Sequence, residues 1–183
     1  APVSDSEVGF SFSKTFTNTP YVFSQAQTYN LGGNNMAASS WFTAVSTTGA
    51  TIDGCAHPGI ANDCSSSTTN ENFSYLAIDP ILQNISTMQL GQESIASSVW
   101  TAVSFSTTYS NPQMLVTANS QNGGENPLYP WARGVTSSGA DVRFCEQDGA
   151  NDCDNHAGED ISWLVIENGL IKDNLGFRPK TEN

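Results

Sequence analysis

The chain has 183 residues, of which 38% are hydrophobic and 13% charged, and its 18 acidic against 6 basic side chains give a net charge of −12. This length permits one large or two small domains with a real hydrophobic core, and the composition is not that of a disordered chain. An acidic surface repels phosphate backbones and anionic bilayers, which excludes nucleic acid as an expected partner. No apolar run is long enough to predict a transmembrane helix, so we expect no membrane insertion.

The first half of the chain predicts β-strands. The segments "YVFSQAQTY" (residues 21–29), "ATIDG" (50–54) and "FSYLAID" (73–79) are rich in β-branched and aromatic residues, with partial alternation or compact apolar runs. Clusters of Gly, Asn, Pro and Ser separate them at hairpin-like spacing. No long segment has the helical period. These features favour an antiparallel β-sandwich.

The second half repeats the first. "QMLVTANSQ" (113–121), "ADVRFCE" (140–146) and "ISWLVIE" (161–167) follow the same order, and the tetrapeptide "ANDC" occurs at 61–64 and again at 150–153. Trp41 falls on Trp131 when the halves are aligned. We therefore predict an all-β fold of two tandem antiparallel β-sandwich units of about ninety residues each. The first occupies residues 1–88, and the second occupies residues 89–183 with a C-terminal tail. The connection at residues 80–94 is expected to include a strand.

The four cysteines fall in matching places of the two units. Pairing within each unit, Cys55 with Cys64 and Cys145 with Cys153, agrees best with a duplication. Disulfides form in an oxidising compartment, so we expect a secreted, extracellular protein, and the start "APVSDSEVGF" fits a mature end left by cleavage. The competing interpretation, a zinc site of four thiolates, lacks the C-x₂₋₄-C spacing of such sites.

Each unit resembles the H-type lectin fold family. The stretches "FSKTFTNTPYVFSQAQTYN", "TTGATI" and "NFSYLAIDP" are similar to that family's entry strand, central turn and closing strand, and "VSFSTTYSNPQMLVTAN", "VTSSGADVRF" and "ISWLVIEN" repeat the plan. The resemblance implies a six-stranded antiparallel sandwich, carbohydrate binding and oligomerisation. It extends to a secreted bacterial branch with polar site residues that would here be Arg133, Glu146, His156 and Glu159. Only the second unit keeps them, because the first has Thr43 near the arginine position.

The second unit also has the residue types that bind sugars. A sugar needs an aromatic surface for its C–H faces and planar polar groups for its paired hydroxyls. "NPLYPWARG" (126–134) offers both within one stretch. The carbohydrate-binding candidates are Tyr129, Trp131, Arg133, Glu146, His156 and Glu159. The alternative is that Trp131 is a repeated core residue like Trp41, with Arg133 paired structurally to Glu146.

The segment "CEQDGANDCDNHAGED" (145–160) is the most acidic stretch of the chain. Calcium prefers six to eight oxygen ligands, and a Gly-containing loop could supply several carboxylates. The candidate calcium ligands are Asp148, Asp152, Asp154 and Asp160, and the alternative is a solvated acidic loop. The chain has neither a nucleophile elbow nor a phosphate-cradling glycine loop, so we expect binding rather than catalysis.

A structural role is the rival to the lectin function. The tail "GLIKDNLGFRPKTEN" (169–183) follows the last predicted strand, where the corresponding part of the first unit leads into the second. Such a tail could add as a strand to the open sheet edge of a neighbouring molecule. An open head-to-tail contact of this kind repeats into a filament. The sequence therefore predicts either a glycan-binding protein or a self-assembling extracellular filament or sheath subunit.

Overall fold

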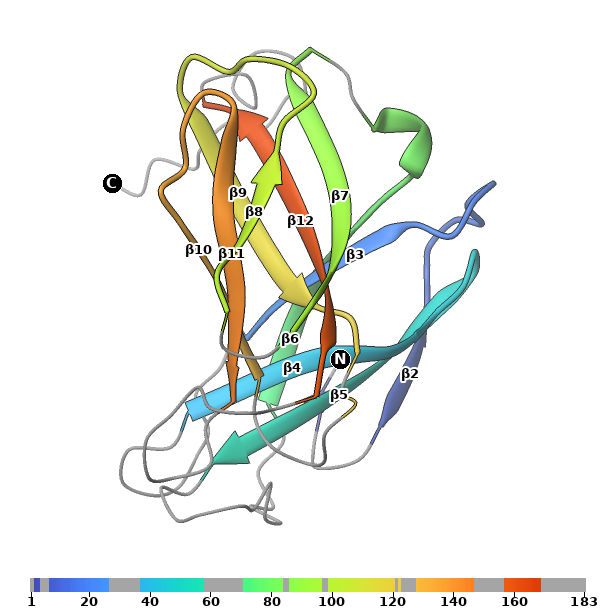
Figure 1. The fold of residues 1–183 in the computed structure, drawn as a ribbon. Coiled ribbons are helices and arrows are strands. Elements are labelled where there is room, and N and C mark those ends of the chain that lie inside the picture. The colour runs from blue at the N-terminus through green and yellow to red at the C-terminus, as the bar shows by residue number, and fades with distance from the viewer. Residues whose placement is uncertain are drawn as a thin grey trace, which may run out of the picture.

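The structure is a computed structural model that describes residues 2–3, 7–26, 37–57, 71–83, 86–96, 99–120, 122, 128–146 and 157–168. These residues form twelve strands and one short 3-10 helix, η1 (Figure 1), so the predicted all-β class is confirmed. No described helix has the length and apolar character that crossing a membrane requires. The elements are β1 (Pro2–Val3), β2 (Val8–Ser11), β3 (Tyr21–Ala26), β4 (Ala37–Val45), β5 (Gly49–His57), β6 (Glu71–Ile78), η1 (Pro80–Leu82), β7 (Met88–Ile95), β8 (Thr101–Ser104), β9 (Pro112–Ala118), β10 (Leu128–Arg133), β11 (Gly139–Glu146) and β12 (Glu159–Glu167).

Strand pairing follows the same order in the two halves of the chain. In the first half, β6 pairs with β1 and β3, and β5 pairs with β2 and β4. In the second half, β12 pairs with β7 and β9, and β11 pairs with β8 and β10. All of these pairs are antiparallel. The strand predicted within residues 80–94 is confirmed as β7.

The turns before β5 and β11 have the same hydrogen bonds. The Ser46 amide donates to the Gly49 carbonyl at 2.9 Å, and the Thr136 amide donates to the Gly139 carbonyl at 2.8 Å. Both glycines are required by close backbone contact: a Cβ on Gly49 would lie 2.3 Å from the Phe10 carbonyl oxygen, and one on Gly139 would lie 2.5 Å from that of Val103. The glycines of "TTGAT" and "SSGAD" therefore let β2 and β8 approach their neighbours.

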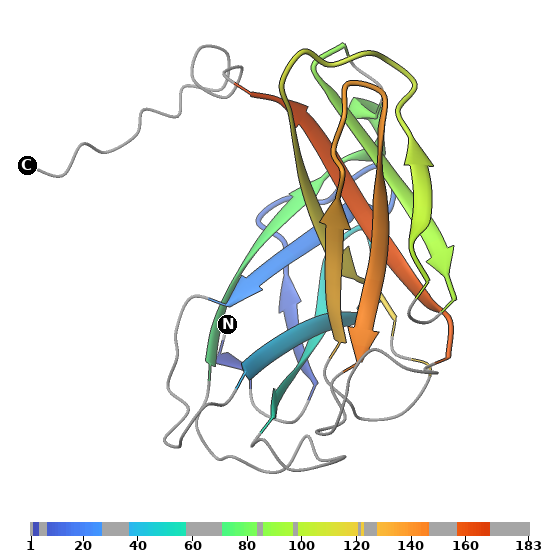
Figure 2. The same ribbon diagram turned by 60° about the vertical axis from the view of Figure 1, so that its left-hand side comes forward.

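The two halves meet through one sheet. Trp41 of β4 pairs in parallel with Ala118 of β9, and this contact joins two three-stranded layers into the six-stranded sheet β2-β5-β4-β9-β12-β7. Figure 2 shows β4 and β9 approaching each other between the halves. The prediction of antiparallel pairing concerned each unit by itself, and this parallel contact lies between the halves. β4 and β9 are the outermost strands of their layers, and their free backbone groups pair when the halves pack side by side.

The core is divided in a way that matches the two halves. One buried cluster belongs to the first half and includes Val22, Phe42 and Ile52. A larger cluster fills the second half and takes in Trp41 from the first. A third cluster, with Phe23, Ile78, Leu90 and Leu164, contains residues of both halves. The halves thus have separate interiors and a shared apolar contact.

Candidate functional site

One face of the sheet formed by β8, β10 and β11 carries aromatic and charged side chains in register. Trp131 of β10 pairs with Arg143 of β11, and Arg133 pairs with Asp141. Trp100 immediately precedes β8, which lies on the other side of β11. Because alternate strand residues point to the same face, these side chains lie outside the buried core residue Val142. We call Trp100, Trp131, Arg133, Asp141 and Arg143 the tryptophan–arginine ladder.

The ladder is stacked. The guanidinium carbon of Arg133 lies 3.9 Å from the centroid of the Trp100 ring. The guanidinium carbon of Arg143 lies 4.5 Å from the Trp100 centroid and 4.9 Å from that of Trp131. The order is therefore Arg133, Trp100, Arg143, Trp131, with cations and indoles alternating. Each such contact contributes about 0.5–2 kcal/mol and helps to hold the planar groups in place.

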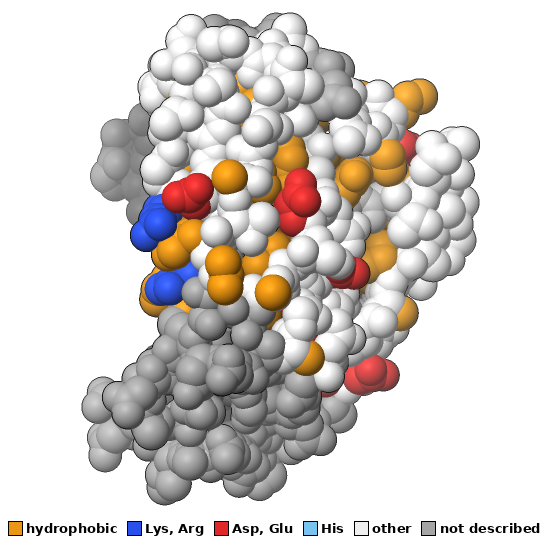
Figure 3. Space-filling view, viewed as in Figure 1, with side chains coloured by type: hydrophobic (Ala, Val, Ile, Leu, Met, Phe, Trp, Pro, Cys, Tyr) orange, Lys and Arg blue, Asp and Glu red, His pale blue; other side chains and the backbone are white. Residues whose placement is uncertain are grey.

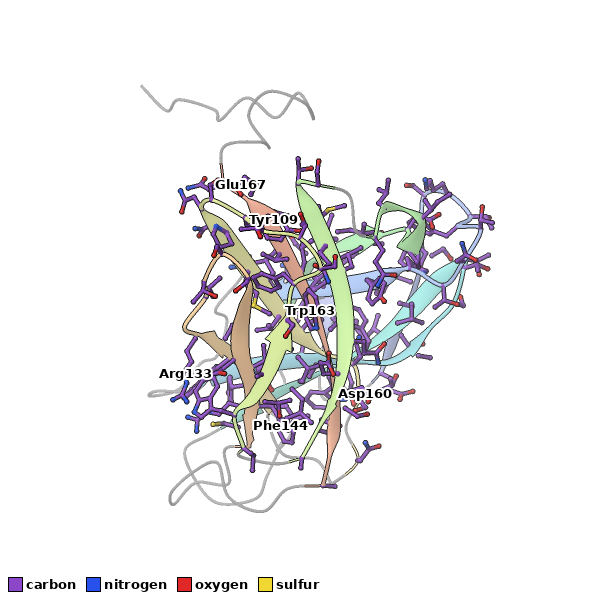
Figure 4. All side chains as sticks on the ribbon, turned by 45° about the horizontal axis from the view of Figure 1, so that its top comes forward. Tyr109, Arg133, Phe144, Asp160, Trp163 and Glu167 are labelled. Carbon is purple, nitrogen blue, oxygen red and sulfur yellow. The ribbon has the colours of Figure 1, made fainter. Side chains whose placement is uncertain are left out.

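The ladder is open to solvent at its ends. Trp131 is 47% exposed. The Nε of Arg133 donates to Asp141 Oδ2 at 3.3 Å, with both side chains well exposed. A surface ion pair of this kind is worth about 0–1 kcal/mol, so a ligand can compete for either partner. Figure 3 shows basic, acidic and hydrophobic side chains next to one another at the edge of the face in view, and Figure 4 shows Arg133 at the periphery of the second half.

The middle of the ladder is enclosed. The Nε atom of Arg143 is buried and has no hydrogen-bond partner among the described residues. Its guanidinium contacts both indole rings. The chain has only 6 basic side chains, and the ladder contains two of them, Arg133 and Arg143. This face is consequently a local cationic and aromatic surface on a strongly acidic protein.

Tyr129 lies two residues before Trp131 on β10, but its environment differs. The residue is half-buried, and burial raises the pKa of Tyr129 to about 12, with the hydroxyl of Ser39 on β4 acting in the opposite direction. Its phenol thus faces the first half of the chain. Tyr129 is therefore not part of the open surface of the ladder.

Glu159 is separated from solvent. It is 1% exposed, and its carboxylate accepts a hydrogen bond from the Asn122 amide at 2.6 Å and another from the Ser120 hydroxyl. These contacts hold the chain that follows β9 against the start of β12. Its position therefore suits a structural carboxylate better than a sugar ligand. The side chains of Glu146 and His156, the other two predicted sugar ligands, lie outside the described residues.

The alternative that Trp131 is a core residue is wrong. Trp41, at the same place in the first half, is 2% exposed because it faces the second half and packs in the core there. Trp131 points away from its own core in the same manner, as its neighbour Ala132 packs inward. No described residue packs over Trp131 in this way. The repeated position is thus buried in one half and open in the other.

The calcium prediction falls mostly outside the described residues, since Asp148, Asp152 and Asp154 are not among them. Asp160 is described, and its carboxylate accepts a hydrogen bond from the Ser94 hydroxyl. No group of three or more His, Cys, Asp or Glu side chains able to hold a metal ion occurs within the described part of the chain. Cys145 is buried and is not a free thiol, but the other cysteines lie outside the described side chains, so both the calcium site and the disulfide pairing stay predictions.

Three ladder residues, Trp100, Asp141 and Arg143, were not among the residues predicted from sequence. The signal for two of them was present, because "ADVRFCE" alternates charged and apolar residues and so places Asp141 and Arg143 on one face. Their proximity to Trp131 depends on the register between β10 and β11. Trp100 lies next to a third strand, β8, and no local sequence pattern indicates that it belongs to this site.

No protein-family description, curated protein or solved structure matches this chain.

Proposed function

We propose that this protein is a secreted, non-enzymatic carbohydrate-binding protein that acts at extracellular glycan surfaces. In this proposal the two halves are tandem β-sandwich units of the H-type lectin kind, which is supported by the strand pairing that recurs in the same order in both. The observation that carries the function is the exposed end of the tryptophan–arginine ladder, where Trp131 is 47% exposed beside planar charged groups.

The ladder provides the two elements of sugar recognition. The exposed part of the Trp131 indole offers an apolar surface to the C–H face of a pyranose ring. Arg133 and Asp141, paired at 3.3 Å, present a donor and an acceptor that suit adjacent hydroxyls. The positive charge of the two arginines favours sugars that carry a carboxylate, because a charge-assisted contact is stronger than a neutral one.

The experiment is a glycan array with the full chain, followed by titration of the best ligand. Trp131→Ala should weaken binding about tenfold, the equivalent of one lost aromatic contact of roughly 1.4 kcal/mol. Leu115→Ala is the matched control, since Leu115 is exposed to a similar degree, at 49%, but lies on β9 outside the ladder. An array without any bound glycan, or equal binding by the two variants, contradicts the proposal.

The second candidate function is that of a self-assembling extracellular filament or sheath subunit. The observation that favours it is a difference in exposure between β6 and β12, which have the same place in the pairing order of the two halves. Tyr75 of β6 is 43% exposed, whereas Trp163, at the matching position of β12, is 3% exposed. Tyr75 lies on a strand, and a strand with an unpaired edge is a template on which another chain can pair.

A further inference from the structure

Strands β6 and β12 differ along one edge. β12 pairs with β7 over nearly its whole length, from Glu159 opposite Ile95 to Ile166 opposite Met88. β6 pairs with β1 at only two positions, Glu71 and Asn72. Among the described residues, no strand pairs with that edge of β6 over residues 74–78. The other edge of β6 pairs with β3 over residues 73–78, as the corresponding edge of β12 pairs with β9 over residues 161–167.

The unpaired edge leaves apolar side chains open. Tyr75 and Leu76 are 43% and 46% exposed, and their counterparts Trp163 and Leu164 are each 3% exposed. The two aromatic residues nevertheless share one inward contact: the ring centroids of Phe12 and Tyr75 lie 5.9 Å apart, as do those of Phe105 and Trp163. Figure 4 shows Trp163 enclosed within the second half. The first half therefore has an open strand edge at which a strand like β7 can pair.

The way β7 fits β12 defines what such a strand must contain. Trp163 lies across the backbone of Gly91, so that a Cβ at this glycine would be 2.2 Å from the indole ring. Leu90, the residue before it, pairs with Leu164 and is fully buried. A strand on the open edge of β6 thus needs a glycine opposite Tyr75 and an apolar residue opposite Leu76.

The C-terminal segment of the chain has this pattern. "NLG" at residues 174–176 matches "QLG" at residues 89–91, and it follows β12 along the chain as β7 follows β6. We infer that residues 173–177 of a second copy add to the open edge of β6, opposite residues 74–78, as an antiparallel strand, with Leu175 opposite Leu76 and Gly176 opposite Tyr75. Pro179 lies two residues beyond this segment and has no amide hydrogen with which to extend the pairing toward Asn72, which already pairs with β1.

Charge supports a second copy as the source of the strand. The tail contains Lys172, Arg178 and Lys180, which are half of the 6 basic side chains of a protein whose net charge is −12. The tail of one copy is therefore attracted to the acidic body of another. The donor segment and the acceptor edge are different surfaces, so each copy can accept one strand and donate one, which gives open head-to-tail chains. This inference rests on the second candidate function.

The test uses the full chain. A photoreactive benzoylphenylalanine in place of Phe177, which would face Ser74, is incorporated into copies with normal isotopes, and these are mixed with uniformly heavy copies. Sedimentation velocity follows assembly across a concentration series, and mass spectrometry identifies the crosslinked peptides. We expect oligomers and crosslinks between light and heavy copies that fall within residues 71–78.

The matched variants are Gly176→Val, which places a side chain against Tyr75, and Gly169→Val, which alters a glycine of the same tail outside the pairing segment. Assembly should be lost in the first and kept in the second. Oligomers whose crosslinks fall elsewhere or within one copy, or that survive Gly176→Val, overturn the strand assignment while leaving self-assembly in place. A protein that stays monomeric at every concentration overturns both.

Discussion

The contact between Gly91 and Trp163 gives a direct test of how tightly β7 is fitted to β12. In the variant Gly91→Ala, the new methyl group would lie 2.2, 2.4 and 2.8 Å from three atoms of the indole ring. Carbon atoms in normal contact are about 3.5–4 Å apart, so the ring or the strand must move by more than an ångström. The ring is rigid and 3% exposed, and β12 is paired on both sides.

The expected cost follows from these distances. Overpacking a filled core costs about 1–3 kcal/mol, and we place this variant at the upper end because neither partner can move freely. Alanine also restricts the unfolded chain more than glycine does, which raises the free energy of unfolding by about 0.4–1 kcal/mol. The net loss in the free energy of unfolding is then about 2 kcal/mol, which in a protein of this size lowers Tm by roughly 4–8 °C.

Urea unfolding and thermal melting, each followed by circular dichroism, measure the effect. Gly9→Ala is the matched control, because a Cβ at this strand glycine meets nothing within 4 Å. The variant Gly91→Ala should also cost less in a Trp163→Leu background, since the clash is with the indole, and a double-mutant cycle isolates that part. Equal melting of Gly91→Ala and Gly9→Ala would refute the reasoning.

Three further predictions concern single side chains. Gly139→Ala brings a Cβ to 2.5 Å from the Val103 carbonyl oxygen and should lower the free energy of unfolding by about 1–3 kcal/mol in urea titrations. Because the pKa of Tyr129 is raised from 10 to about 12, the unfolded phenol ionises near pH 10 while the folded one keeps its proton to about pH 12. The contribution of Tyr129 to the free energy of unfolding is therefore complete below pH 10 and falls as the pH rises from 10 to 12. This fall should be smaller in Tyr129→Phe when unfolding is measured at successive pH values. Glu159→Ala leaves the Asn122 amide without its acceptor and should cost about 1–3 kcal/mol by the same titration.

The sequence predicted much of the fold because the relevant signals are local. Gly49 and Gly139 mark two turns with the same hydrogen bonds, and the apolar runs around them became β5, β6, β11 and β12. The short strands β2 and β8 were not predicted, since four residues carry too little pattern and their conformation depends on pairing with β5 and β11. The parallel contact at Trp41 is likewise a matter of packing between halves, which no local pattern encodes.

The site was predicted less completely for a related reason. Trp131 and Arg133 are neighbours along the chain and could be grouped by inspection. Arg143 reaches them only through the β-sheet register. Glu159 was expected on the surface, because it is a charged residue in an acidic segment. It is instead buried, since two hydrogen-bond donors that follow β9 bind its carboxylate.

Both candidate functions depend on repeated positions that are buried in one half of the chain and exposed in the other. Trp41 is buried because the second half packs over it, and Trp131 is open because no described residue does so. Trp163 is buried because β7 runs beside it, and Tyr75 is open because β1 stops two residues into β6. The repeated positions favour large aromatic residues, which are costly to leave in water without a partner. An open Trp131 among cationic side chains suits a small polar ligand, whereas an open Tyr75 on an unpaired edge suits a strand, so the same repeat can supply two different binding surfaces.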